Sequence, residues 1–113
     1  MLPKVMVVDD EPMVRRFVST ILSGSGYDVV DADSPEQAVL MMESHRDIDL
    51  LVTDVVMPNV NGRELASQLT KRQPGLRVLF MSGCESGSMQ GASFLQEPFR
   101  IPELLARVRE ILA

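Results

Sequence analysis

The sequence is poor in cysteine and lysine and has no long apolar run, and each shortage excludes a class of protein. The single cysteine, Cys84, rules out an internal disulfide and is typical of a reducing compartment, so we expect a cytoplasmic location. No apolar run approaches the ~18 residues that cross a bilayer. The N-terminus lacks a signal-peptide pattern. We therefore expect no direct contact with a membrane.

Basic residues are also scarce and scattered. Lys4 and Lys71 are the two lysines among 11 basic residues, and the formal net charge is -5. Binding to nucleic-acid phosphates needs clustered Lys and Arg, so we expect no direct nucleic-acid contact. The 113 residues suit one domain, and the sequence contains no repeat and no linker-like tract. We predict a single domain over residues 1–113.

The most informative stretch covers residues 48–58. Residues 48–53 are mostly apolar or β-branched, which predicts a short strand buried on both faces. Asp54 follows the strand, and Pro58 closes the turn after it. Open α/β sheets place their chemistry at the carboxyl ends of parallel strands. Taken alone, however, Asp54 fits an acid that merely solvates a strand end.

Short apolar strands alternate with helical patterns along the chain. We predict strands over residues 4–8, 27–31, 48–53, 76–81 and 92–96. We predict helices from Pro12 to the Gly24-Ser25-Gly26 stop, from Pro35 to about His45, over residues 63–72, and from about Ile101 to the end. This alternation predicts a doubly wound, parallel α/β sheet. Residues 82–91 include three glycines and no apolar stripe, so we expect a loop or a single turn there.

Apolar stripes mark the faces that the first and last helices bury. The first stripe recurs at helical spacing and comprises Val14, Phe17, Val18, Ile21 and Leu22. The last helix carries a second stripe of Ile101, Leu104, Leu105, Val108, Ile111 and Leu112. Ser34 and Gln37 are spaced as a capping box at the start of the second helix. We expect both stripes to pack on the sheet.

Acidic residues follow two of the predicted strands. Asp9 and Asp10 end the first strand, and Asp54 ends the third. If these strands are neighbours, ~4.8 Å separates them, and each close pair of carboxylates repels by roughly 3 kcal/mol. Such a cluster needs a cation or shifted pKa values, and Mg²⁺ suits oxygen ligands. Asp54 beside Mg²⁺ can attack a phosphoryl group, and the hydroxyl of Ser82, after strand four, can donate to a phosphoryl oxygen.

The chain resembles the receiver domains of the two-component response regulator family. The matching elements occur in order along nearly the whole chain: Val-Asp9-Asp10-Glu11, Thr-Asp54-Val-Val-Met-Pro58 with Gly62, Met-Ser82-Gly, and Phe94-Leu-Gln-Glu97-Pro98-Phe99. The resemblance implies a flavodoxin-like, five-stranded parallel sheet in the order 2-1-3-4-5. It also implies a phosphorelay role as a conformational switch, and no enzyme activity beyond self-phosphorylation and self-dephosphorylation.

The resemblance also implies a role for each site residue. Asp54 would accept a phosphoryl group from a histidine kinase or a histidine phosphotransfer domain. Mg²⁺ would be held by Asp9, Asp10, Asp54 and the backbone carbonyl of Val56. Ser82 would be the switch hydroxyl and Phe94 the switch aromatic, although Phe94 fits a plain core residue equally well.

The chain departs from the family pattern in two places. Glu97 stands where family members carry a lysine, and no lysine follows Lys71. Arg100 is the one cation near Glu97 in sequence, and we do not expect it to substitute for the lysine. The segment 82–91 is short for the family's fourth helix, which we expect to be shortened or absent, as in receivers attached to hybrid sensor histidine kinases. We still expect the family's cis peptide at Glu97-Pro98.

Two other functions remain open at this point. Glu97 favours a pseudo-receiver, which is a protein-interaction module with impaired phosphorylation or switching. A metal-dependent phosphohydrolase with Asp54 as nucleophile is the third hypothesis. Haloacid-dehalogenase-like enzymes, however, carry a second Asp where this chain has Val56, and they use a lysine far downstream, whereas no lysine follows Lys71 here.

Overall fold

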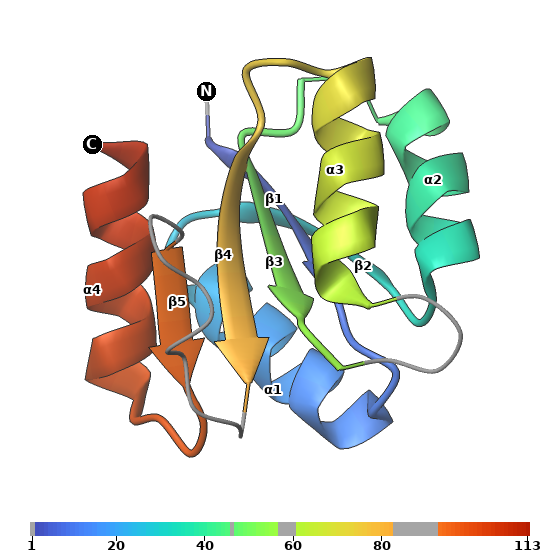
Figure 1. Ribbon diagram of the computed structural model, residues 1–113. Coiled ribbons are helices and arrows are strands. Elements are labelled where there is room, and N and C mark those ends of the chain that lie inside the picture. Colours follow the sequence, from blue (N-terminus) through green and yellow to red (C-terminus); the bar gives the residue numbers. More distant parts are fainter. Residues whose placement is uncertain (1, 46, 57–60, 83–92) are drawn as a thin grey trace.

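Five parallel strands form one sheet with helices on both faces (Figure 1). This computed structural model describes residues 2–45, 47–56, 61–82 and 93–113. The strands are β1 Lys4–Val8, β2 Asp28–Ala32, β3 Leu50–Asp54, β4 Arg77–Ser82 and β5 Ser93–Gln96. The helices are α1 Pro12–Gly24, α2 Pro35–Ser44, α3 Gly62–Arg72 and α4 Ile101–Leu112. The order β2-β1-β3-β4-β5 confirms the predicted fold. The prediction for residues 82–91 lies, beyond Ser82, outside the described residues.

Alternation along the strands builds two cores, one on each face of the sheet. In β1, Val5 and Val7 point to the cluster under α1 and α4, whereas Met6 and Val8 point to the cluster under α2 and α3. Because successive strand residues face opposite sides, a strand buried on both faces must be apolar throughout. The central strands β1 and β3 are accordingly almost fully buried, while β2 at the edge exposes Asp28.

Several strand boundaries differ from the predicted ones by one or two residues, and the starts of β2 and β3 shift for local reasons. The second strand begins at Asp28 rather than Tyr27, because the Tyr27 N–H donates to the Leu22 carbonyl and closes the end of α1. Gly26 makes this closure possible by adopting a positive φ of 96°. The third strand begins at Leu50 rather than Ile48, whose N–H and carbonyl both bond to the side chain of Gln73.

The capping prediction for α2 is confirmed in part. The Ser34 side chain accepts a hydrogen bond from the Gln37 N–H at 3.2 Å, as expected for an N-cap residue. The Gln37 side chain, in contrast, accepts from the N–H of Asp33, one residue before the cap. Two side chains therefore satisfy backbone donors at this helix start.

The apolar stripes of α1 and α4 are only partly buried. Val18, Leu22, Leu104 and Val108 are fully buried under the sheet, as predicted. Phe17 and Ile101 were expected to join them, but they are 46% and 45% exposed. Ile101 is the first residue of α4, whereas Phe17 lies between the partly buried Val14 and the buried Val18. The Phe17 ring instead contacts Phe99, with centroids 6.4 Å apart.

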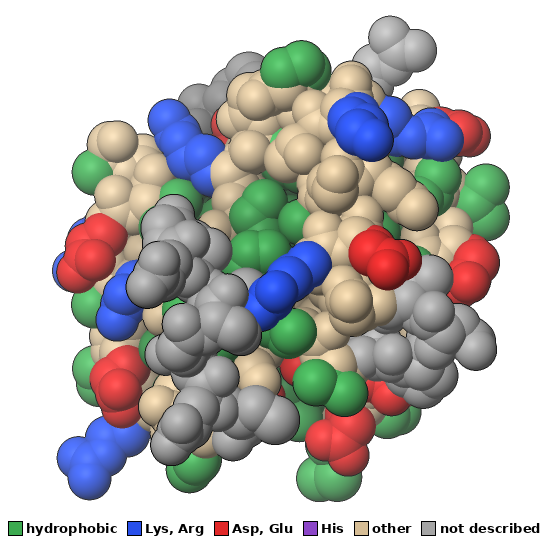
Figure 2. Space-filling model, in the orientation of Figure 1, with side chains coloured by type: hydrophobic (Ala, Val, Ile, Leu, Met, Phe, Trp, Pro, Cys, Tyr) green, Lys and Arg blue, Asp and Glu red, His purple; other side chains and the backbone are tan. Residues whose placement is uncertain are grey.

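Charged side chains of both signs are intermingled on the face that Figure 2 shows. This distribution agrees with the scattered arginines of the sequence. Among the described residues, no helix has the length and apolarity needed to cross a membrane.

Candidate functional site

The carboxyl ends of four strands bring the predicted site residues to one edge of the sheet. Asp9 follows β1, and Asp54 ends the neighbouring strand β3. Ser82 ends β4 on the other side of β3, and Glu97 follows β5. The expectation that the first, third and fourth strands are neighbours is therefore confirmed.

Three carboxylates converge at this edge. Asp9, Asp10 and Asp54 each offer one oxygen, and these oxygens lie within 4.8 Å of one another. Asp9 is only 2% exposed, whereas Asp10 is open to solvent and Asp54 is intermediate. Ligand oxygens around one Mg²⁺ lie about 3–4 Å apart, so small side-chain movements would let all three share an ion. The donor set is the one that a hard divalent cation prefers.

Backbone amides hold two of these carboxylates in place. The Glu11 N–H donates to Asp9 Oδ1 at 2.9 Å, and the Val56 N–H donates to Asp54 Oδ1 at 3.3 Å. Each acid thus bonds to the amide two residues further along the chain, which is the Asx-turn arrangement. The turns after β1 and β3 therefore fix the direction of both side chains.

Burial raises the pKa of Asp9 from 3.8 to about 7. The hydrogen bond from Glu11 opposes this rise, but the charges of Asp54, Glu97 and Asp10 reinforce it. The pKa of Asp54 is also raised, chiefly by burial and further by Asp10 and Glu11, against the effect of the Val56 and Val55 amides. Without a cation, the protein therefore disfavours full ionisation of its own acidic pocket.

Glu97 belongs to the same electrostatic group. Its N–H donates to the Ser82 carbonyl at 2.7 Å, which continues the pairing of β4 with β5. The Glu97-Pro98 peptide is cis, as predicted. Burial raises the pKa of the Glu97 carboxyl, and the charges of Asp54 and Glu11 raise it further. The half-buried Glu97 side chain thus adds negative charge to the pocket.

Ser82 and Phe94 lie on the strands beyond Asp54. Ser82 is almost fully buried at the end of β4. Phe94 pairs with Phe80 across β4 and β5 and is half-buried against the core under α2 and α3. Its packing agrees with a core residue, and the switch role stays a prediction.

A family model for the response regulator receiver domain matches residues 5–109. The chain belongs to the response regulator receiver family. Response regulator MprA from Mycobacterium avium is 36% identical over 116 residues, which cover 96% of this chain and 50% of MprA. The chain thus spans about half the length of that curated relative.

Solved receiver structures share the whole fold. The receiver domain of the hybrid histidine kinase CckA has a TM-score of 0.84 and 32% identity, covering 97% of this chain and 99% of its own. The response regulator TrrA from Thermotoga maritima, solved in complex with Mg²⁺ and BeF, has a TM-score of 0.86 and 25% identity, covering 98% and 100%. These structures and the chain therefore share the receiver-domain fold.

Gly62 of this receiver domain lies against the acid at the end of β3. A Cβ atom on Gly62 would lie 2.1 Å from the carbonyl oxygen of Asp54. The Gly62 N–H also donates to the Val55 carbonyl at 2.7 Å, which ties the start of α3 to the end of β3. Only glycine permits this close approach, so Gly62 helps to set the backbone of the acidic strand end.

The sequence did not single out Arg15, which joins β1 and β2 beside the pocket of the receiver. Its Nη1 donates to the Asp9 carbonyl at 2.9 Å, and its Nε lies 3.5 Å from Asp31 Oδ2. Helical side chains point back toward the helix N-terminus, so a cation in the first turn of α1 lies beside the strand ends. The position of Arg15 in the first turn of the predicted helix was therefore the sequence signal that could have pointed to it.

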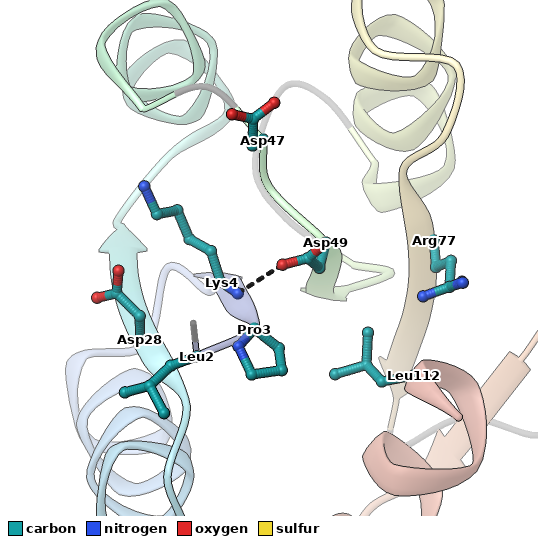
Figure 3. A pocket seen from close by; sticks show the side chains of 8 residues that line it. All are labelled: Leu2, Pro3, Lys4, Asp28, Asp47, Asp49, Arg77 and Leu112. Atoms are coloured by element: carbon teal, nitrogen blue, oxygen red, sulfur yellow. Dashed lines mark hydrogen bonds between the residues drawn. The ribbon is translucent and has the colours of Figure 1, made fainter.

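A hollow lies at the amino edge of the sheet, opposite the acidic pocket. It has a volume of about 630 Å³, and its lining includes Lys4, Asp28, Asp47, Asp49 and Arg77. Figure 3 shows these side chains around the starts of β1, β2 and β4, where Lys4 N–H donates to Asp49. None of the residues that line this hollow belongs to the predicted site, which lies at the other end of the strands.

Proposed function

We propose that this receiver domain accepts a phosphoryl group on Asp54 in a Mg²⁺-dependent reaction and then acts as a conformational switch. The proposal rests mainly on the convergence of Asp9, Asp10 and Asp54 at the carboxyl edge of the sheet, where one carboxylate oxygen of each lies within 4.8 Å of the others. The relative TrrA, which was solved with Mg²⁺ and BeF, supports the same chemistry.

The transfer needs an ionised Asp54 and a phosphohistidine donor. An Asp54 carboxylate oxygen attacks phosphorus, and a P–O bond forms while the P–N bond of the donor breaks. The bonding electron pair stays on the imidazole nitrogen, which takes up a proton. The raised pKa of Asp54 opposes this step in the metal-free protein. A bound cation would lower that pKa and ionise the nucleophile.

Four oxygen donors would hold the ion. They are the side chains of Asp9, Asp10 and Asp54 and the backbone carbonyl of Val56, which lies two residues after Asp54. When bound, Mg²⁺ supplies positive charge that neutralises the phosphoryl oxygens and orients them. The amide bonds to Asp9 and Asp54 keep both carboxylates at the sheet edge without the ion, which reduces the cost of assembling the site.

Ser82 and Phe94 would read the phosphoryl group. The Ser82 hydroxyl, at the end of the strand next to Asp54, would donate to a phosphoryl oxygen. Movement of Ser82 would reach β5, because Ser82 pairs with Gln96 and accepts from the Glu97 N–H. The half-buried Phe94 would then change its packing, which is the switch that we propose.

The exposed apolar side chains around the site fit a protein donor. Met13 and Phe17 on α1 are 84% and 46% exposed and line a hollow of about 630 Å³ with Pro12 and Ile21. Exposed apolar surface of this kind marks interaction sites. A histidine kinase or a histidine phosphotransfer domain is therefore the proposed partner, docked over α1 so that its phosphohistidine reaches Asp54.

The remaining expectations belong to the same proposal. Residues 1–113 would form one receiver domain of a cytoplasmic signalling protein. It would act without direct nucleic-acid or membrane contact and without enzymatic turnover beyond phosphorylation and dephosphorylation of itself.

A pseudo-receiver is the second candidate, and Glu97 is the observation that favours it. Phosphorylation adds an anion to a pocket where the pKa of Glu97 is already raised by burial and by the charge of Asp54. In that case the domain would bind partners without cycling phosphate.

Incubation with acetyl phosphate and Mg²⁺, followed by intact-mass measurement, tests the proposal. We expect one phosphoryl group on the unaltered protein and on Asp28→Asn, which changes an exposed acid at the far edge of the sheet. Asp54→Asn should take up none. If the unaltered protein binds Mg²⁺ but takes up no phosphoryl group, the result would favour the pseudo-receiver instead.

A further inference from the structure

Glu97 is tied to the acidic pocket by its backbone as well as its charge. The hydrogen bond from its N–H to the Ser82 carbonyl, 2.7 Å long, extends the β4–β5 pairing by one residue past Gln96. Its side chain is half-buried, and its charge acts on Asp9 while the charges of Asp54 and Glu11 act on it. Any force on this carboxylate is therefore passed to the ends of β4 and β5.

Glu97 nevertheless lies outside the group that can share an ion directly. Among the described residues, the acids whose oxygens lie within 4.8 Å of one another are Asp9, Asp10 and Asp54. Mg²⁺ gives up its waters reluctantly and usually keeps several of them. An acid just beyond the ligands can therefore act on the hydrated ion without replacing a ligand.

Arg15, beside the pocket, is engaged elsewhere. Its guanidinium donates to the main-chain carbonyl of Asp9 and pairs with Asp31 on β2. The negative charge that Glu97 adds is thus available to a cation at the Asp cluster. The attraction is strong over a few ångströms in a half-buried site and weakens with added salt.

We propose that Glu97 is an outer partner of the divalent cation, which strengthens cation binding and couples it to the ends of β4 and β5. Cation binding by itself, before any phosphoryl transfer, then draws the Glu97 carboxylate toward the Asp cluster. The shift reaches Ser82 through the backbone hydrogen bond, and it reaches α1 through the Phe99–Phe17 ring contact. This inference rests on the proposed Mg²⁺ site but does not need Asp54 to be phosphorylated.

Magnesium titrations of the unphosphorylated protein, followed by amide NMR spectra, test the inference. We expect Glu97→Gln to weaken Mg²⁺ binding by roughly three- to tenfold and Glu97→Lys to weaken it further. The Mg²⁺-induced shifts of the Ser82 and Phe99 amides should shrink in both variants. Glu110→Gln makes the same charge change on an exposed acid near the far end of α4, and it should bind within about twofold of the unaltered protein.

Asp10→Asn separates failure of the inference from failure of the metal site. If Asp10→Asn weakens Mg²⁺ binding and Glu97→Gln leaves it unchanged, the metal site stands and the role of Glu97 is overturned. If neither variant changes the affinity, both the metal site and the inference fall. Well-dispersed amide spectra of each variant exclude unfolding as the cause of a lost affinity.

Discussion

The backbone of Gly62 lies so close to Asp54 that a Cβ atom would stand 2.1 Å from the Asp54 carbonyl oxygen. This contact joins the start of α3 to the end of β3, on the strand that carries the acid. The two ends are also linked by the hydrogen bond from the Gly62 N–H to the Val55 carbonyl. The position of the acidic strand end therefore depends on the absence of a side chain at the start of α3.

Gly62→Ala should destabilise the protein, because the added methyl group meets main-chain atoms that cannot rotate away. We expect the free energy of unfolding to fall by about 1–3 kcal/mol, as measured by urea denaturation. Gly24→Ala is the matched control, since no atom lies within 4 Å of the place its methyl group would take and Gly24 ends a helix. That control should be neutral or stabilising by up to about 1 kcal/mol. Equal stabilities of the two variants would contradict the close contact.

The stability of the metal-free protein should fall as pH rises from about 4 to about 7. An aspartate side chain ordinarily has a pKa of 3.8, whereas the pKa of Asp9 in the fold is about 7. The folded state therefore binds this proton more tightly than the unfolded state. This contribution is fully present below pH 3.8 and is lost as pH passes through 7, at most about 4 kcal/mol in all. The raised pKa values of Asp54 and Glu97 act in the same direction.

Urea denaturation in a chelator, repeated across this pH range, measures the effect. Asp9→Asn should flatten the pH dependence because it removes the main titrating group, whereas Asp28→Asn should leave it in place. Saturating Mg²⁺ should also reverse the trend, since the ion binds the ionised pocket of the folded state alone. A stability that rises steadily with pH in the chelator would contradict the raised pKa of Asp9.

Glu97→Lys should enlarge the structural response to the phosphoryl mimic beryllofluoride with Mg²⁺. The substitution changes the charge at this position by two units and places a cation where the family pattern has one. A charge-assisted contact to the mimic is typically worth ~1.5–3 kcal/mol. Amide NMR spectra with and without the mimic measure the response, and Glu110→Lys controls for a general charge effect. Equal, full responses of the unaltered protein and Glu97→Lys would contradict the prediction that Glu97 weakens the switch.

The strand order was predicted from the family resemblance, whereas the acids at the strand ends could be read from local patterns in the sequence. Unbroken apolar runs in β1 and β3 indicated central strands, and the acids after them had to meet once those strands paired. Helical periodicity shows which face of a helix is apolar, but it does not show how much of that face the neighbouring layer covers. Phe17 and Ile101 are exposed for this reason, although both belong to apolar stripes.

Side-chain bonds to distant backbone atoms were also beyond the reach of local patterns. Gln73 satisfies the backbone of Ile48 across 25 positions of sequence and so delays the start of β3. Arg15 contacts Asp9, which follows β1, and Asp31 on β2, and these two residues come together only in the folded sheet. Such contacts depend on the tertiary arrangement, which no single segment encodes.

The two ends of the chain lie at the amino edge of the sheet, where Leu2 and Leu112 border the same hollow (Figures 1 and 3). Asp54 lies at the opposite edge, one strand length or roughly 17 Å away. Any polypeptide joined to either end would therefore leave the domain at the edge opposite Asp54. A change at Asp54 would therefore reach such a neighbour through shifts of the strands and helices that lie between the two edges.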